Sequence, residues 1–253
     1  MMHAKHLFAV APEDLRVLLW DIDGTLLRST RVGAFTDYTA PAVASVFGTT
    51  GRLSELRRVS GMTDLQIVAE ALRDEGITPE RIRERVDELR TRFMIEMRRV
   101  AATEKTAGSP LFQLLPGVRE ILTRVAAHPR YLSSLLTGNL EPAAYLKLQL
   151  VGLDDFFQLP GAFGDDSHDR RDLPALAAAR LNAHLNLDLR PAQFIIIGDT
   201  PNDIACARHF GARCVAVCTG RLDSVETLAA RHPDAMLPDL SDTEATVCAF
   251  DNL

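Results

Sequence analysis

Four short apolar runs, separated by helical patterns, constrain the fold of this chain more than any other feature. Strands that are buried on both faces show nearly continuous apolar runs, whereas half-exposed strands alternate apolar and polar residues. Between the runs, apolar residues recur every three or four positions, which predicts helices near residues 118–125, 173–181 and 204–208. The runs are Val17–Trp20, Leu132–Leu136, Phe194–Ile197 and Cys214–Cys218. This alternation predicts an α/β fold with a Rossmann-like, doubly wound parallel sheet.

Residues 31–113 interrupt the alternation, because they show helical periodicity and no strand-like run. The clearest helix is expected to begin at Thr78 and Pro79, a capping residue followed by a proline at the first helical position. Its apolar residues recur over about five turns to Val100, with Arg and Glu between them on a solvated face. We therefore expect a core built from residues 1–30 and 114–253, with a smaller all-helical cap domain at 31–113 inserted after the first core strand.

Composition excludes several classes of protein. The 253 residues carry a net charge of −6, which gives no overall electrostatic reason to bind nucleic acid or an anionic membrane surface. No segment approaches the roughly 20 apolar residues of a membrane-spanning helix. The four cysteines form no Cys-x-x-Cys pair, so we expect reduced thiols and a cytoplasmic protein.

Polar side chains follow three of the predicted strands, at the edge where open parallel sheets bind ligands. Asp-x-Asp after a strand is also common in turns and helix caps, but a second acidic pair after another buried strand favours a shared site. Four carboxylates in one place repel one another unless a cation compensates them, and Mg²⁺ prefers oxygen ligands of this kind. The residues that follow the three strands are Asp21 and Asp23 after the first, Thr137, Gly138 and Asn139 after the second, and Asp199 and Asp203 after the third. The pattern therefore predicts a magnesium site at this edge.

These motifs resemble those of the haloacid dehalogenase superfamily, in order and in strand context, over nearly the whole chain. The stretch from Asp21 to Thr25 is similar to the first family motif, Thr137 to the second, and the stretch from Gly198 to Asp203 to the fourth. The insert resembles the helical cap of the first type (C1). Segments such as Gly61–Asp64 are similar to those of phosphoglycolate-phosphatase-like members.

The resemblance implies a phosphatase that acts on a small phosphorylated metabolite. Asp21 would attack phosphorus and form an aspartyl-phosphate, and Asp23 would protonate the leaving oxygen and then deprotonate the attacking water. The resemblance also implies the remaining roles. Mg²⁺ would be held by Asp21, the backbone carbonyl of Asp23, Asp199 and Asp203. The phosphoryl oxygens would be bound by Thr137, Gly138, Asn139 and Arg170. The rest of the substrate would be contacted by Gly61 and Thr63 of the cap.

The third family motif is a basic residue, and two arginines occupy the expected stretch. A helix is expected to follow with Asp172 as its N-cap, so that the residues before it are extended and point alternately to opposite sides. On that argument only one arginine faces the acids, and we expect Arg170 rather than Arg171. Lys147 is the next candidate if neither arginine serves.

Three other functions stay open. A phosphosugar mutase of the same superfamily usually adds a basic pair in the cap, where this chain has Arg52, Arg57 and Arg58. A phosphoryl-accepting receiver module also clusters acids and a threonine at strand ends, but it lacks the helical insert. The third is a non-catalytic binding protein on the same fold. The identity of the phosphomonoester, with specificity expected around residues 58–64, and the oligomeric state are not determined by the sequence.

Overall fold

The computed structural model describes residues 10–57 and 59–253, so Arg58 lies outside the described residues. Its main sheet has five parallel strands in the order β4-β1-β5-β6-β7. The strands are β1 Arg16–Trp20, β4 Tyr131–Leu135, β5 Phe194–Gly198, β6 Arg213–Val217 and β7 Ala235–Leu237. The four predicted strands are confirmed to within one residue at each end. The short edge strand β7 was not predicted.

Both faces of the sheet are covered, which explains the continuous apolar runs. Along β1, Val17 and Leu19 pack with α7 and α8 on one face, whereas Leu18 and Trp20 pack with α5 and α10 on the other. The strand order reverses at β1, which lies between β4 and β5. The carboxyl end of β1 is therefore at a topological switch point, the usual ligand site of such sheets. The α/β, doubly wound fold class is confirmed.

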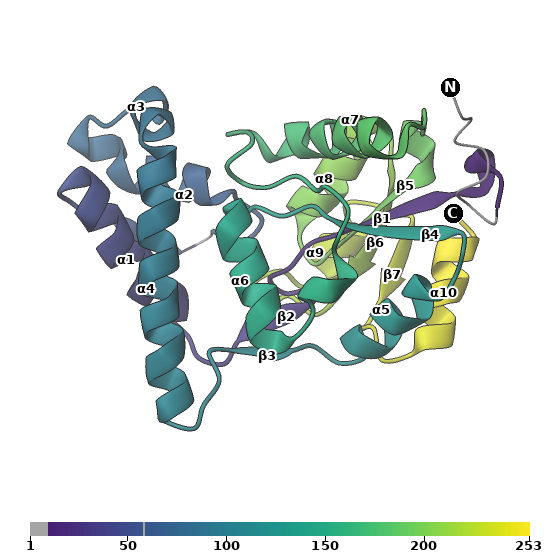
Figure 1. Cartoon of the computed structure of the whole chain (residues 1–253), viewed down its shortest axis with the longest axis horizontal. Coiled ribbons are helices and arrows are strands. Elements are labelled where there is room, and N and C mark those ends of the chain that lie inside the picture. The colour runs from purple at the N-terminus through teal and green to yellow at the C-terminus, as the bar shows by residue number, and fades with distance from the viewer. Residues whose placement is uncertain (1–9, 58) are drawn as a thin grey trace.

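The helices form two groups in Figure 1. Helices α1–α4 stand to one side of the sheet, α6 lies between them and the sheet, and the C-terminus lies on the opposite side. The helices are α1 Ala34–Phe47, α2 Asp64–Leu72, α3 Pro79–Glu84, α4 Val86–Thr106, α5 Val118–Ala126, α6 Glu141–Val151, α7 Leu173–Leu185, α8 Pro201–Phe210, α9 Val225–Ala229 and α10 Thr243–Asp251. Within the described residues, every helix is too short or too polar to span a lipid bilayer.

The long cap helix that we predicted is broken at Arg85. Thr78 caps α3 through its hydroxyl, as expected, but α3 ends at Glu84 and α4 continues from Val86. Arg85 leaves the helical conformation, and its guanidinium donates to the carbonyl of Val46 near the end of α1. This contact satisfies a free helix-end carbonyl and fixes the angle between the two cap helices.

The chain crosses twice between the sheet and the cap helices, and the two crossings pair with each other. Strands β2 Leu27–Ser29 and β3 Phe112–Leu114 form an antiparallel ribbon that we did not predict. A single apolar cluster continues from the sheet through α6 into α1 and α4. The domain bounds 1–30, 31–113 and 114–253 stay a prediction, although the crossings lie close to both of them.

Candidate active site

Three buried carboxylates lie together at the carboxyl ends of β1 and β5. Asp21 follows β1, Asp199 follows β5, and Asp203 belongs to the first turn of α8. One oxygen atom from each lies within 4.8 Å of the others. All three residues are at most 5% exposed. Oxygen donors gathered at this density are what a divalent cation such as Mg²⁺ requires.

The first loop approaches these acids so closely that a glycine is needed. Gly24 has a φ of +90°, and a Cβ atom there would lie 2.2 Å from Asp199 Oδ2. The next residue, Thr25, donates its hydroxyl to Asp199 Oδ1 at 3.2 Å. Gly24 therefore lets the loop after β1 pack against the loop after β5, and Thr25 orients Asp199.

Asp203 is held by the start of its own helix. Its Oδ2 accepts the amide and the hydroxyl of Thr200 at 3.0 and 2.7 Å, which makes Thr200 the N-cap of α8. In the sequence, Asn202 precedes the apolar pattern of Ile204 and Ala207 and is the expected N-cap of this helix, but that expectation is wrong. Asn202 lies inside the first turn, and its amide donates to Gly61 of the cap at 2.9 Å.

Arg170 is the cation of this cluster. Its Nη2 lies 2.5 Å from Asp203 Oδ1 and 3.2 Å from Asp21 Oδ1, with the side chain 6% exposed. Arg171 instead pairs with Asp169 at the surface. The extended arrival that we assumed was wrong, because residues 170–172 form a 3₁₀ turn capped by Asp169. A 3₁₀ turn also points successive side chains in different directions, so only one arginine faces inward.

Burial and mutual repulsion make the acids hard to ionise together. Burial raises the pKa of Asp21 to about 6, opposed by Arg170 and reinforced by Asp203 and Asp23. Burial, together with the charges of Asp21 and Asp203, raises the pKa of Asp199 well above its ordinary value. One arginine thus does not neutralise the cluster, and a bound divalent cation would favour the ionised carboxylates.

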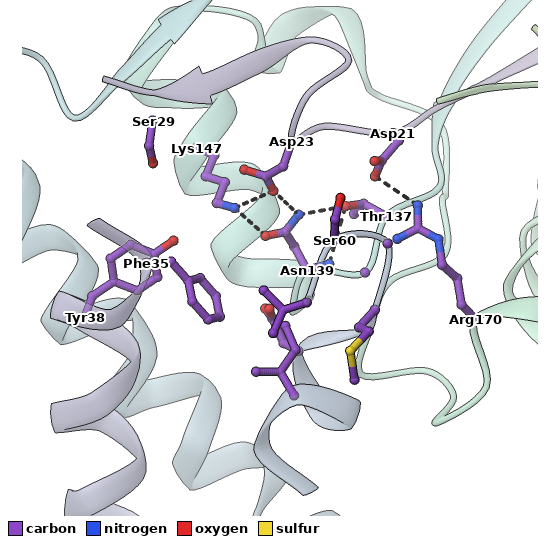
Figure 2. Close-up of a pocket in the computed structure, with 16 residues that line it drawn as sticks. Asp21, Asp23, Ser29, Phe35, Tyr38, Ser60, Thr137, Asn139, Lys147 and Arg170 are labelled. Atoms are coloured by element: carbon purple, nitrogen blue, oxygen red, sulfur yellow. Dashed lines mark hydrogen bonds and ion pairs between the residues drawn. The ribbon is translucent and has the colours of Figure 1, made fainter. Parts of the chain in front are cut away.

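The loop between β4 and α6 contacts Asp23 rather than the three buried carboxylates. Asn139 donates from Nδ2 to Asp23 Oδ2 at 2.8 Å and to Thr137 Oγ1 at 2.7 Å. Lys147 of α6 reaches the same Asp23 oxygen at 2.6 Å. The Asp23 side chain is 46% exposed, so it lies at the mouth of the site (Figure 2).

The cap loop at residues 61–64 packs directly on the loop between β4 and α6. The Asp64 amide donates to the Gly138 carbonyl at 2.7 Å, and Asp64 Oδ2 accepts the Leu140 amide at 2.9 Å. A Cβ atom on Gly138 would lie 2.2 Å from the Met62 carbonyl, so only glycine permits this approach. The cap is thereby fastened over the acids.

Gly61 and Thr63, which we expected to contact substrate, are placed differently. Gly61 lines the cavity through its backbone. Thr63 is fully buried, and its hydroxyl accepts the Gln66 amide at 3.1 Å as the N-cap of α2. Thr63 is not among the residues that line the cavity, so the structure brings Gly61 but not Thr63 to the site.

A cavity of about 190 Å³ opens between the acids and the cap. It is lined by Asp21, Asp23, Thr137, Gly138, Asn139 and Arg170, which the sequence predicted. Gly61, also predicted, lines it as well. Val59, Ser60, Met62 and Asp64 belong to the stretch 58–64 in which we expected specificity, and Lys147 was expected only as a substitute for the arginine. The lining residues that the sequence did not single out are Ser29, Phe35, Tyr38 and Ile67. Lys147 had a signal, since it is a lone charge between Leu146 and Leu148 in an apolar helix. The aromatic residues had none, because a buried aromatic on a helix is normally core.

The chain is similar in sequence to a known family of hydrolases. A family model described as haloacid dehalogenase-like hydrolase matches residues 18–208. The chain is 25% identical over 234 residues to a phosphoglycolate phosphatase from Photorhabdus laumondii subsp. laumondii, covering 92% of both chains. It is 28% identical over 228 residues to a phosphoglycolate phosphatase from Pectobacterium atrosepticum, covering 90% of both chains.

Among solved structures, the fold resembles a β-phosphoglucomutase from Clostridium difficile. The TM-score is 0.63 at 15% identity, covering 94% of this chain and 98% of that one. At this identity the likeness supports the fold alone.

Proposed function

Because the chain belongs to the haloacid dehalogenase-like hydrolase family, we propose that it is a magnesium-dependent phosphatase that hydrolyses a small phosphomonoester through an aspartyl-phosphate. The observation that carries this proposal is the position of Asp21. Its carboxylate lies among buried acids, 3.2 Å from Arg170, and lines the cavity beneath the cap. A nucleophile, a cation for the phosphoryl group and a metal-binding donor set are thus within one site.

The donor set fits magnesium. Three buried carboxylates with only Arg170 among them are unfavourable alone, and oxygen ligands of this kind suit a hard divalent cation. Asp21, Asp199 and the backbone carbonyl of Asp23 would hold the ion, with Asp203 orienting its waters or binding directly. When bound, the ion supplies positive charge to the phosphoryl oxygens.

The chain's own residues would divide the reaction into two displacements. Asp21 attacks phosphorus, the ester P–O bond breaks, and Asp23 gives a proton to the leaving oxygen. Water then attacks the phosphorus of the aspartyl-phosphate, gives a proton to Asp23 and releases phosphate, which regenerates Asp21. Arg170, Thr137 and the amides around Gly138 would hold the phosphoryl oxygens throughout.

The cavity favours a small substrate. Its volume of about 190 Å³ suits an ester with a few carbon atoms, and the docked cap loop restricts access by larger ones. Both relatives are named phosphoglycolate phosphatases, so phosphoglycolate is the first substrate to test. We propose a small phosphorylated metabolite as the ligand, with no nucleic acid or membrane as a partner, and a cytoplasmic location.

Of the three cap arginines considered for a mutase, the structure describes Arg52 and Arg57, and these two give little support to that alternative. Arg52 is engaged by Glu70 and Asp74 within the cap. Arg57 lines a separate surface cavity with Pro201 and Leu222. Neither belongs to the cavity at Asp21, where a second phosphate would have to be bound.

The test is phosphate release from a panel of small phosphorylated acids, sugars and nucleotides, with Mg²⁺ or with EDTA. We expect turnover with Mg²⁺ only, and incorporation of ¹⁸O from labelled water into the released phosphate. Asp21→Asn should retain its fold, because the change is nearly isosteric, and should lose turnover. Retention of more than about a hundredth of the wild-type rate would contradict the covalent mechanism, since loss of a general acid alone costs roughly 10²–10⁴-fold.

A receiver module would take up phosphate without turnover, and a binding protein would do neither. A mutase would transfer phosphate between positions of a sugar phosphate rather than release it. The same panel therefore separates all four functions.

A further inference from the structure

We propose that Lys147 is a positioning residue, which holds the side chains of Asp23 and Asn139 so that Asp23 faces the leaving-group oxygen. This inference rests on the proposed phosphatase function and concerns the same cavity. Lys147 belongs to α6, outside the loops that carry the acids, and its side chain is 3% exposed.

Lys147 contacts one residue of the loop after β1 and one residue of the loop after β4. Its Nζ donates to Asp23 Oδ2 at 2.6 Å and to Asn139 Oδ1 at 2.5 Å. Asn139 in turn donates to Asp23 and to Thr137. Figure 2 shows these four side chains as one continuous network along the cavity wall. Loss of Lys147 would therefore remove one of the two donors to Asp23 and the donor to Asn139 Oδ1, which loosens both side chains.

Asp23 needs such support because its surroundings do not confine it. The side chain is 46% exposed, and a half-exposed carboxylate can rotate among several rotamers. Two donors fasten Oδ2, while Oδ1 has no hydrogen-bond partner among the described residues. One oxygen thus fixes the orientation, and the other is left for a proton transfer to the substrate.

Lys147 and Arg170 contact different acids of the site, Asp23 in the first case and Asp21 with Asp203 in the second. In Figure 2 Lys147 approaches from the side of Tyr38 and Phe35, whereas Arg170 approaches from the side of Asp21. The ammonium also lies 5.6 Å from the ring centroid of Phe112, on the ribbon that leads to the cap. The two cations therefore serve opposite ends of the cavity.

A purely structural role would not require a charge at this position. Burying an ammonium is costly, and apolar residues often replace buried ion pairs without loss of stability. The buried ammonium is instead held by two oxygen acceptors, Asp23 Oδ2 and Asn139 Oδ1. Retention of the cation next to Asp23 points to function.

The test uses two esters that differ in their need for an acid. p-Nitrophenolate leaves without a proton, whereas the alkoxide of phosphoglycolate requires one. The comparison uses kcat/KM, which reports the steps up to departure of the leaving group and not the later hydrolysis of the aspartyl-phosphate that both esters share. For Lys147→Met we expect kcat/KM on phosphoglycolate to fall by at least about 100-fold and kcat/KM on p-nitrophenyl phosphate by less than about 10-fold. In an Asp23→Asn background, Lys147→Met should cost little more, because both changes remove the same step. Lys147→Arg, which keeps the charge, should recover part of the loss.

Arg208→Met is the matched control, since Arg208 pairs with Asp234 far from the cavity, and it should leave both esters unaffected. Lys147→Gln, neutral and closer in length, carries the same prediction if Lys147→Met does not fold. Equal losses on both esters, or no loss, would overturn the inference while leaving the phosphatase function intact. A wild-type protein that releases no phosphate from either ester would overturn both.

Discussion

Arg170 donates a 2.5 Å hydrogen bond from Nη2 to Asp203 Oδ1, and both side chains are almost completely buried. Asp203 in turn is fixed by Thr200 through the capping box of α8. The guanidinium is therefore held from behind by a rigid helix end, and its Nη2 also reaches Asp21. This arrangement prepares a cation beside the nucleophile before any substrate binds.

We predict unequal effects of the two neighbouring arginines on kcat/KM. Arg170→Ala leaves buried acids and phosphoryl charge uncompensated, which should cost about 3–5 kcal/mol, or roughly 10²–10⁴-fold. Arg171→Ala removes an exposed pair with Asp169 and should cost less than about 1 kcal/mol. Both variants are measured side by side. A larger loss for Arg171→Ala would reverse the assignment.

We predict that Mg²⁺ stabilises the folded protein. The ion relieves repulsion among Asp21, Asp199 and Asp203, and at about 100 times its Kd a ligand adds roughly 2.7 kcal/mol. For a chain of this length that corresponds to a rise in Tm of roughly 5 °C or more over the EDTA-treated protein. Asp199→Asn should abolish most of the rise, whereas Asp37→Asn at the cap surface should keep it. An unchanged Tm at saturating Mg²⁺ would refute the proposed site.

We predict that ionisation of Asp64 weakens the fold as the pH rises. Burial raises the pKa of Asp64 to about 7, although Lys147 and the Leu140 amide oppose it, so the folded state binds a proton more tightly than the unfolded state. Below the ordinary value near 3.8 both states are protonated, and above about 7 the folded state bears the whole cost. The difference corresponds to at most roughly 4 kcal/mol, lost between pH 4 and 7.

The check is the free energy of unfolding at pH 5 and pH 8 for the wild type and Asp64→Asn. The amide oxygen of asparagine can still accept the Leu140 N–H, so the variant should lose less stability than the wild type between these pH values. Parallel curves for the two proteins would show that Asp64 does not titrate in this range.

We predict that the docked cap excludes macromolecular substrates. Met62 and Asp64 lie against Gly138, and Asn202 holds Gly61, so the cavity has no room for a polypeptide. Free O-phosphoserine and the same residue within a phosphoprotein present one ester in two sizes. If the enzyme accepts the free amino acid, kcat/KM for the phosphoprotein should be at least about 100-fold lower. Comparable values would indicate an open site.

Local sequence patterns determined the elements that depend on local causes. The runs at Val17–Trp20 and Phe194–Ile197 predicted parallel strands, since residues buried on both faces must be apolar whatever packs on them. Once the strands are parallel, Asp21 and Asp199 must emerge at the same edge. The acidic cluster was therefore predictable without any knowledge of side-chain contacts.

Tertiary packing decided the features that depend on distant partners. The helix break at Arg85 follows from a carbonyl on α1, and the short strand β7 forms only because β6 offers it an edge. The N-cap of α8 is Thr200 rather than Asn202, whose side-chain amide instead donates a hydrogen bond to Gly61 of the cap domain. Lys147 acquires its role from Asp23, which is 124 residues away. These contacts join residues that are far apart in the sequence. Hydrophobic periodicity and capping patterns describe only neighbouring residues, so such contacts are seen only in the folded chain.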